Sequence, residues 1–310
     1  MIYQMVMTNR FKLNVGKRTR ILNVFRRTFK FKPFEKLLAR KIRSGSPDSF
    51  WVRLAPPNYL YPKNSRRCVV RAGIKYDLDL SDFIEHWAYF GATEPSHERL
   101  FQLAENKRVL IDVGVNMGAI LLNFAKVAPN GIVFGFEPDD KNYRKAQRNL
   151  ALNKINNVTI IKKGLGDQNL SSKLFKVNDD NEGMNRIFDD ANDTLFEGLS
   201  FEEIQVIKLD DFVEERGLSG LDLMKIDVEG YELKVLRGAI STIGKYHPTM
   251  FIELDDNNLK AQNDSANLLI EFLESEGYRV YRADTCQTLS SSNDYTDCHF
   301  DVIAESDHYI

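Results

Sequence analysis

The pattern of apolar and polar residues becomes regular from residue 107 onward. Apolar runs of strand length recur there between longer segments with helical periodicity. The predicted strands cover residues 108–113, 131–137, 158–162, 221–227, 248–254, 278–283 and 299–305. The predicted helices cover residues 117–128, 139–153, 231–246 and 258–277. Strands that alternate with helices predict an α/β domain whose mostly parallel sheet is covered on both faces.

The last two predicted strands are separated by loop-like sequence only, with no crossover helix between them. Two strands joined in this way pair as an antiparallel hairpin. We therefore predict a Rossmann-like α/β sandwich with a seven-stranded, mostly parallel sheet that ends in an antiparallel C-terminal hairpin.

Three further segments follow from the composition of the remaining sequence. We expect an insertion at residues 168–204, where two predicted strands flank a polar stretch. Residues 50–106 carry scattered prolines and one helical piece near 80–90, and we expect them to form an accessory cap on the main domain, residues 107–310. Residues 1–49 are predicted to be a basic arm that ends in the linker-like cluster SGSPDS.

Charge is distributed unevenly along the chain, although the net charge is only −2. Thirteen Lys or Arg residues and a single acid lie within residues 1–43, so the rest of the chain is acidic. An enzyme acting on nucleic acid would carry its basic face on the main domain, and we expect no nucleic-acid partner. Within residues 10–43, apolar residues recur at three- and four-residue steps, which predicts an amphipathic helix in peripheral contact with an anionic membrane. A disordered, solvated tail and an organellar transit peptide are the alternatives.

The cysteine spacing favours a reducing compartment, and the hydropathy argues against membrane insertion and secretion. The three cysteines have neither CxxC nor metal-type spacing, which argues against a disulfide framework. No apolar run is long enough to span a bilayer or to resemble a secretory signal. We therefore expect a cytoplasmic protein, and the sequence leaves its oligomeric state open.

A glycine-rich segment follows the first predicted strand. It reads DxGxNxG, with Asp112, Gly114, Asn116 and Gly118, where a dinucleotide-binding loop would read GxGxxG. An acid at the strand end would repel a pyrophosphate but suits an ammonium group such as that of a methionine moiety. Glu137 closes the second strand, where an acid can accept hydrogen bonds from both ribose hydroxyls of a nucleoside. The alternative is that Glu137 only lies near the positive N-terminus of the following helix.

The stretch LMKIDVEGYE, residues 223–232, begins as a buried strand and ends in acids. In a parallel sheet its carboxyl end lies at the same edge as Asp112. We therefore predict Asp227 and Glu229 as the catalytic residues, one of which orients an acceptor hydroxyl and takes its proton. Glu232 lies in the first turn of the next helix, where the helix dipole by itself explains an acid.

A metal site is the alternative use of the acids at this edge. Asp227, Glu253, Asp255 and Asp256 could offer oxygen ligands to Mg²⁺ or Ca²⁺. Asp255 and Asp256 also fit as the start of a loop that caps the next helix, and we favour this interpretation, so no metal is predicted. The five histidines show no ligand spacing, and none is predicted as the base.

With these residues in view, the chain resembles the FkbM-type family of methyltransferases over roughly residues 108–305. The matching strings are IDVGVNMG (111–118), FEPD (136–139), NLALNKINNVTIIKKGLGD (149–167), KLDDF (208–212), LMKIDVEGYELKVLRGA (223–239) and HPTMFIEL (247–254). The resemblance implies a class I methyltransferase fold that uses S-adenosylmethionine, typically for O-methylation of a sugar or a small polar hydroxyl acceptor. It also implies that the glycine loop holds the methionine end of the cofactor, Glu137 the ribose, and Gly164 and Leu165 the adenine edge. Val115 and Gly164 stand where relatives usually have alanine.

Other functions remain as alternatives to O-methylation. An N-methyltransferase acting on protein or RNA is disfavoured by the acidic main domain and by DVEG at the position where amino-group enzymes of this fold carry an NPPY-type motif. A non-catalytic binding module for S-adenosylmethionine or a membrane is disfavoured because the acids at 112, 137 and 227 are intact. A dehydrogenase is disfavoured by the DxGxNxG loop.

Overall fold

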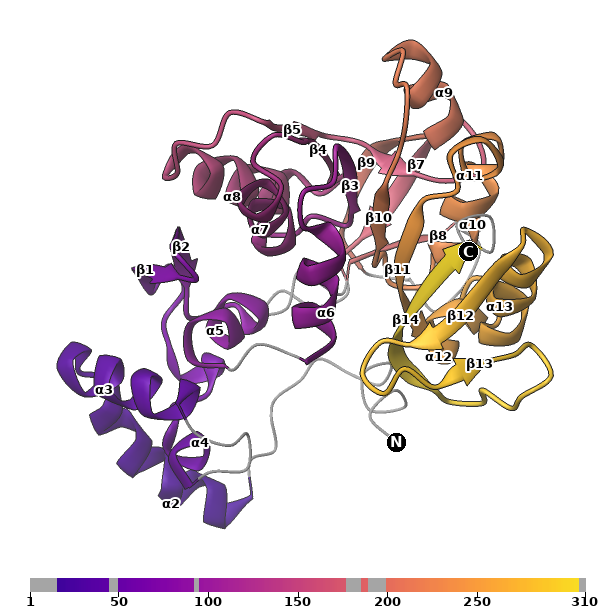
Figure 1. The fold of residues 1–310 in the computed structure, drawn as a ribbon. Coiled ribbons are helices and arrows are strands. Elements are labelled where there is room, and N and C mark those ends of the chain that lie inside the picture. Colours follow the sequence, from indigo (N-terminus) through magenta and orange to yellow (C-terminus); the bar gives the residue numbers. More distant parts are fainter. Residues whose placement is uncertain (1–15, 45–49, 92–94, 177–184, 189–198, 307–310) are drawn as a thin grey trace. The chain divides into compact units, whose positions relative to one another are not determined.

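The computed structural model describes residues 16–44, 50–91, 95–176, 185–188 and 199–306. The described residues fall into two compact units, one formed by residues 16–91 and the other by residues 95–306 (Figure 1). Among the described residues, no helix combines the length and the apolarity needed to cross a bilayer.

The first unit contains a cluster of short helices and one β-hairpin. Its elements are α2 (Lys17–Arg26), η1 (Arg27–Lys30), α3 (Lys32–Arg43), α4 (Phe50–Leu54), η2 (Asn58–Leu60), β1 (Arg66–Arg71), β2 (Ile74–Asp79) and α5 (Phe83–Phe90). Strands β1 and β2 pair in antiparallel register, and α3 packs on α5. Leu38, Ala39 and Ile42 are the buried apolar residues of α3. The described part of the predicted arm is therefore helical rather than a disordered tail. The helix expected near residues 80–90 is α5.

The second unit is built on an eight-stranded mixed sheet. Its strand order is β13-β12-β14-β11-β10-β3-β4-β5, with β11, β10, β3, β4 and β5 parallel and β14 antiparallel to both of its neighbours. The bounds are β3 (Val109–Val113), β4 (Ile132–Phe136), β5 (Val158–Ile161), β10 (Leu223–Ile226), β11 (Thr249–Asp255), β12 (Tyr278–Arg282), β13 (Thr288–Leu289) and β14 (His299–Ser306). The predicted α/β sheet and its antiparallel C-terminal hairpin are confirmed. The count of seven is short by one, because the loop before β14 contributes the two-residue strand β13.

Helices cover both faces of this sheet. The bounds are α6 (Pro95–Ala104), α7 (Ala119–Val127), α8 (Asp140–Ala151), α9 (Leu209–Glu215), α10 (Glu232–Arg237), α11 (Ile240–Tyr246), α12 (Asp256–Lys260) and α13 (Ala266–Ser275). One buried cluster joins the sheet to α6, α7 and α8, and a second joins it to α9, α10, α11 and α13. Successive residues of β10 alternate between the two clusters, with Leu223 in one and Met224 in the other. This double burial explains why the strands read as nearly continuous apolar runs.

Two of the predicted helices are each split into two. The helix expected at 231–246 breaks at Gly238, whose carbonyl accepts a hydrogen bond from the backbone of Asp210. The Asp210 carboxylate then accepts hydrogen bonds from the first backbone N–H groups of α11, including that of Thr242 at 2.8 Å. The helix expected at 258–277 breaks where Asn263 has φ of 62° and Ser265 caps α13.

The predicted insertion forms a second, four-stranded sheet. Its strands are β6 (Gly164–Leu165), β7 (Leu170–Phe175), β8 (Arg186–Phe188) and β9 (Phe201–Ile207), in the order β6-β9-β7-β8. The two strands predicted at the ends of the insertion are β7 and β9, whereas β8 lies in the stretch that we expected to be polar loop. A small buried cluster that contains Leu174, Ile187 and Val206 also includes Tyr231 from the start of α10. The insertion is thereby packed against the segment that follows β10.

Candidate active site

The carboxyl ends of β3 and β10 lie against each other, as the parallel topology predicts. Asp112 is paired in register with Lys225, and the backbone N–H of Asp227 donates to the carbonyl of Val113. Gly114 has φ of 84°, and a Cβ atom there would lie 1.9 Å from the carbonyl oxygen of Asp227. Only glycine allows the two chain segments to approach so closely.

Asp112 is fully buried at this edge. Neither of its carboxylate oxygens accepts a hydrogen bond from a described residue, and the nearest cation is Lys225, whose Nζ lies 3.6 Å from Oδ1. Burial raises the pKa of Asp112 to about 6, although Lys225 acts in the opposite direction. A buried carboxylate with unused acceptor capacity is a suitable place for a cationic ligand group.

Lys225 is the functional-site residue that the sequence interpretation missed. Its side chain is buried, and its Nζ lies 3.0 Å from Asp227 Oδ2 and donates to the carbonyl of Gly114 at 3.3 Å. Burial lowers the pKa of Lys225, but Asp227 and Asp112 outweigh that effect and leave it above its ordinary value. The available signal was a single lysine inside the otherwise apolar strand LMKI.

Asp227 is the most accessible acid of this group. Its side chain is 43% exposed, whereas that of Asp112 is 0% exposed. The carboxylate is thus held on one side by the ammonium of Lys225 and is open to solvent on the other. A carboxylate in this position can receive a proton from a bound hydroxyl group.

Glu137 holds the glycine loop as well as facing the edge of the sheet. Its two carboxylate oxygens accept hydrogen bonds from the backbone N–H groups of Asn116 at 2.7 Å and Asp139 at 3.0 Å. Burial raises the pKa of Glu137 to about 8, and these two donors act against the rise. Since a carboxylate offers about four acceptor positions, roughly two are left for a ligand. Glu137 also lies near the N-terminus of the following helix, because it accepts a hydrogen bond from Asp139, the residue that caps α8.

The rest of the glycine loop adopts conformations that its residue types favour. Asn116 has φ of 51° and Gly118 has φ of 90°, both in the left-handed region that asparagine and glycine tolerate. The side-chain amide of Asn149 in α8 donates to the carbonyl of Met117 at 2.9 Å, which ties the loop to the neighbouring helix.

Glu229 lies in an ion-paired cluster rather than in an open position. Its Oε2 lies 3.4 Å from Arg186 Nη2 and accepts a hydrogen bond from the amide of Asn258 at 2.9 Å. The guanidinium of Arg186 also donates to the amide oxygen of Asn258 at 2.7 Å. Burial raises the pKa of Glu229 to about 7, which Arg186 opposes and Asp227 reinforces. Glu229 also has φ of 56°, a conformation that costs a non-glycine residue about 1 kcal/mol or more.

Arg186 is the second residue that sequence analysis did not identify. It lies in β8 of the insertion, and its neighbour Asn185 donates to the Asp139 carboxylate at 3.0 Å. Lys176, at the end of β7, forms an ion pair with the same carboxylate. The adjacent residues Asn185 and Arg186 thus contact two different segments: Asn185 contacts the one after β4, and Arg186 the one after β10. Strands β4 and β10 lie on either side of β3 in the sheet.

Glu232 supports the turn between β10 and α10. Its Oε1 accepts hydrogen bonds from the backbone N–H groups of Val228 and Gly230, both at 3.0 Å. Burial raises the pKa of Glu232 to about 7, and these donors oppose the rise. Glu232 therefore has a structural role in this turn through hydrogen bonds, beyond the helix-dipole interaction that we expected.

Further along the same edge, His299 and Asp255 form a second pair. Nδ1 of His299 lies 2.9 Å from Asp255 Oδ2, and this hydrogen bond raises the pKa of His299. Asp255 also caps α12 by accepting from the backbone N–H of Asn258, as predicted. Glu253 is deeply set in β11, and burial raises its pKa well above the ordinary value. Among the described residues, no group of His, Cys, Asp or Glu side chains has the arrangement of a metal site.

Gly164 and Leu165 lie in β6, which pairs with β9 of the insertion sheet. Leu165 is buried in the core of the main sheet, and Gly164 lies against Ile187 and Val206. Their predicted contact with adenine would therefore have to come from the backbone.

These motifs coincide with a known family. A family model described as the methyltransferase FkbM domain matches residues 112–280, which is more than half of the chain. The chain belongs to the FkbM methyltransferase family. It is a methyltransferase, and the methyl donor of this family is S-adenosylmethionine.

Individual relatives share about a quarter of their aligned residues with this FkbM-family chain. Methyltransferase 1 from Beauveria bassiana is 26% identical over 192 residues, which is 55% of this chain and 72% of that protein. The 2-O-methyltransferase NoeI from Sinorhizobium fredii is 25% identical over 191 residues, which is 58% of this chain and 76% of NoeI. Methyltransferase FkbM from Methylobacillus flagellatus, whose crystal structure is known, has 17% sequence identity to this chain. The TM-score is 0.39, and the comparison covers 64% of this chain and 44% of that chain.

The residues of the edge fit S-adenosylmethionine. The oxygens of Asp112, which accept no hydrogen bond from the described residues, suit its ammonium group. Glu137 retains acceptor positions for its ribose, and Gly114 keeps the loop free of a side chain between them. When bound, this cofactor supplies a methyl group that is already activated on a sulfonium.

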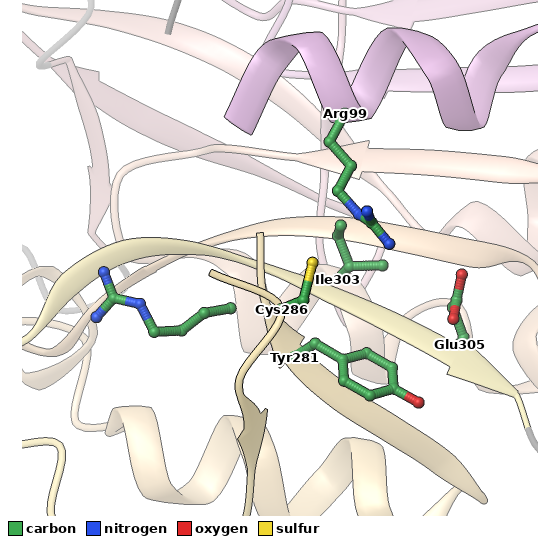
Figure 2. A pocket seen from close by; sticks show the side chains of 6 residues that line it. Arg99, Tyr281, Cys286, Ile303 and Glu305 are labelled. Carbon is green, nitrogen blue, oxygen red and sulfur yellow. The ribbon is translucent and has the colours of Figure 1, made fainter. Parts of the chain in front are cut away.

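A separate small cavity of about 120 Å³ lies against the other end of the sheet (Figure 2). It is lined by Arg99, Tyr281, Arg282, Cys286, Ile303 and Glu305. Arg282 is engaged there by a two-point ion pair with Asp284. The lining includes none of the residues of the candidate active site.

Proposed function

We propose that this methyltransferase methylates a hydroxyl group of a sugar or of another small polar acceptor. The observation that supports this most directly is the position of Asp227, an exposed carboxylate that Lys225 holds beside the buried Asp112. The name of the relative NoeI, a 2-O-methyltransferase, agrees with a hydroxyl acceptor.

We further propose that the residues predicted from the sequence bind the cofactor. Asp112 and the glycine loop with Gly114, Asn116 and Gly118 would hold the methionine end, and Glu137 would accept the ribose hydroxyls. The backbone of Gly164 and Leu165 would face the adenine. Deep burial of both carboxylates supports these roles, because a bound ammonium or hydroxyl would satisfy acceptor positions that described residues leave unused.

In this proposal Asp227 and Glu229 have different tasks. Asp227 orients the acceptor oxygen and takes its proton as the new carbon–oxygen bond forms, since its carboxylate is open to solvent. Glu229 is a positioning residue that anchors the insertion through Arg186 and Asn258. Most of the acceleration then comes from alignment of the acceptor with the methyl group.

The insertion would select the acceptor, because it reaches the active-site edge through Asn185 and Arg186. No nucleic-acid partner is proposed. Cytoplasmic location and peripheral membrane contact of the arm stay predictions.

The test is methyl transfer from labelled S-adenosylmethionine to a panel of sugars, small polyols and small amines, combined with calorimetric binding of the cofactor. We expect Asp227→Asn to bind the cofactor as the wild type does and to lose turnover by about 10²–10⁴-fold. Asp284→Asn, which alters an exposed carboxylate distant in sequence from the edge, is the matched control and should keep full activity. Full activity of Asp227→Asn would remove this residue from the role, and labelling of amines alone would overturn the hydroxyl assignment.

A further inference from the structure

The surface of the first unit concentrates exposed apolar side chains. Eight of the sixteen large hydrophobic residues that are exposed in the described part of the chain lie between residues 21 and 51. Seven of these eight expose more than half of their surface, and the eighth, Trp51, exposes 40%. They are Ile21, Val24, Phe25, Phe31, Phe34, Leu37, Phe50 and Trp51. Scattered apolar side chains need no explanation, but such a concentration marks an interaction surface.

Five of these residues belong to α3, to the residue before it, or to α4, which contacts α3, and we call them the aromatic ridge: Phe31, Phe34, Leu37, Phe50 and Trp51. The rings of Phe31 and Phe34 are 5.7 Å apart, and those of Phe50 and Trp51 are 6.0 Å apart. Lys41, one helical turn beyond Leu37, places its ammonium 6.0 Å from the ring of Trp51 and links the two pairs.

The aromatic ridge lies on a different face of α3 from the residues that pack the unit. Leu38, Ala39 and Ile42 are buried, whereas Phe34 and Leu37 point outward. Helix α3 therefore has an apolar side in addition to the one that its own unit covers. Helix α2 behaves similarly, because its exposed residues Ile21 and Phe25 lie on the side opposite Asn23, which is the buried position of that helix.

Charge around the aromatic ridge is almost entirely positive. Eleven Lys or Arg residues and one acid lie in the described stretch 16–44. The acid is Glu35, which is buried on the inner face and held by Arg67 at 2.6 Å and by the hydroxyl of Tyr61. The outer face thus presents exposed cations without a competing carboxylate from the same stretch. Those cations include Lys17, Arg18, Arg27, Lys32, Lys36, Arg40 and Lys41.

We propose that helices α3 and α4, together with Phe31 just before α3, bind the surface of an anionic lipid bilayer through the aromatic ridge. The aromatic rings and Leu37 enter the boundary between headgroups and acyl chains, and the surrounding lysines and arginines contact anionic headgroups. A protein partner would need an equally acidic and apolar surface, whereas an anionic bilayer offers both features at once. This inference concerns where the enzyme resides, and it does not depend on the proposed acceptor.

The experiment is sedimentation of the full-length protein with vesicles of phosphatidylcholine alone and with vesicles of equimolar phosphatidylcholine and phosphatidylserine. We expect binding to the anionic vesicles only, with a loss at high salt. The double variant Phe34→Ser/Leu37→Ser should weaken binding by about tenfold or more. The charge variant Lys36→Glu/Arg40→Glu should reduce it by about the same factor.

The matched control is Val70→Ser/Phe83→Ser, which removes two exposed apolar residues of the same unit outside the ridge and should leave binding unchanged. Calorimetry with S-adenosylmethionine on every variant shows whether the second unit is intact, so failure of this proposal is distinguishable from failure of the proposed function.

A spectroscopic readout tests the position of the ridge itself. The chain has two tryptophans, Trp51 and Trp87, so Trp87→Phe leaves Trp51 as the single indole probe. Its emission should shift to the blue with anionic vesicles and stay unchanged with neutral ones. Equal binding to both vesicle types, no binding at all, or concentration-dependent dimerisation that the ridge variants abolish would overturn the proposal.

Discussion

The guanidinium of Arg186 lies 3.4 Å from the carboxylate of Glu229, across a sequence separation of 43 residues. One partner belongs to a strand of the insertion and the other to the acidic turn after β10. Asn258 contacts both, which makes the cluster three-membered. An insertion fastened in this way at the edge of the sheet can shape the acceptor site as part of a fixed structure.

Replacement of Arg186 tests how much its ion pair with Glu229 stabilises the fold. We expect Arg186→Met to lower the free energy of unfolding by about 1–3 kcal/mol, because the carboxylate of Glu229 loses its only cationic partner in the described cluster. A double-mutant cycle with Glu229→Gln, measured by urea unfolding, should give a coupling energy of about 1 kcal/mol. Arg216→Met changes an exposed arginine and serves as the control. Additive effects in the cycle would show that the ion pair contributes nothing.

The close approach of Gly114, after β3, to Asp227, after β10, can be tested by adding a side chain at position 114. Gly114→Ala places a Cβ 1.9 Å from the carbonyl of Asp227, so we expect a loss of several kcal/mol in stability and of cofactor binding. Gly217→Ala is the matched control, because Gly217 also has a positive φ but has open space around it. That control should cost about 1 kcal/mol and leave binding unchanged. Equal effects of the two substitutions, measured by urea unfolding and calorimetry, would contradict the clash.

Lys225 should be essential to the charge balance of the edge. We expect Lys225→Met to lower the free energy of unfolding by about 3 kcal/mol, since it leaves Asp112 buried without its nearby cation. Turnover should fall as well, because Asp227 loses the group that orients it. Lys154→Met, which removes an exposed lysine of the same unit, should change both quantities little. Retention of wild-type turnover by Lys225→Met would show that Asp227 does not need this contact.

Stability should depend on pH through the buried carboxyls. Burial raises the pKa of Glu137 from its ordinary 4.5 to about 8, so the folded state keeps this proton over a range in which the unfolded state has already released it. The free energy of unfolding of the cofactor-free protein should therefore fall as pH rises from about 5 to about 8.

Glu137→Gln should reduce that slope, measured by urea unfolding across the pH range. The slope is the readout, since glutamine also loses one acceptor for the loop backbone. Glu271→Gln removes an exposed carboxyl and should leave the slope as in the wild type. An unchanged slope in Glu137→Gln would mean that this carboxyl titrates normally in the folded protein.

The local pattern of the sequence was sufficient for the frame of the site. Apolar periodicity predicted the seven main strands, and their order along the chain placed Asp112, Glu137 and Asp227 at strand ends. The prediction was wrong where local signals are weak: β13 has two residues and β8 has three, too short for a period to be visible. The helix predicted at 231–246 was split by contacts between Gly238 and Asp210, which belong to different segments of the chain. The helix predicted at 258–277 was split at Asn263, which has a positive φ just before the Ser265 cap of α13.

The sequence by itself determined which residues face the core and which strand ends carry acids, because side-chain periodicity follows directly from helix and strand geometry. Only the tertiary structure decided how those acids are neutralised. Lys225 bridges Asp112 and Asp227, Arg186 meets Glu229, and His299 meets Asp255. Apart from Lys225 and Asp227, which are two residues apart, these partners are distant in the sequence, so their pairing depends on the path of the whole chain. A buried charge is stabilised by whatever opposite charge folding brings within a few ångströms.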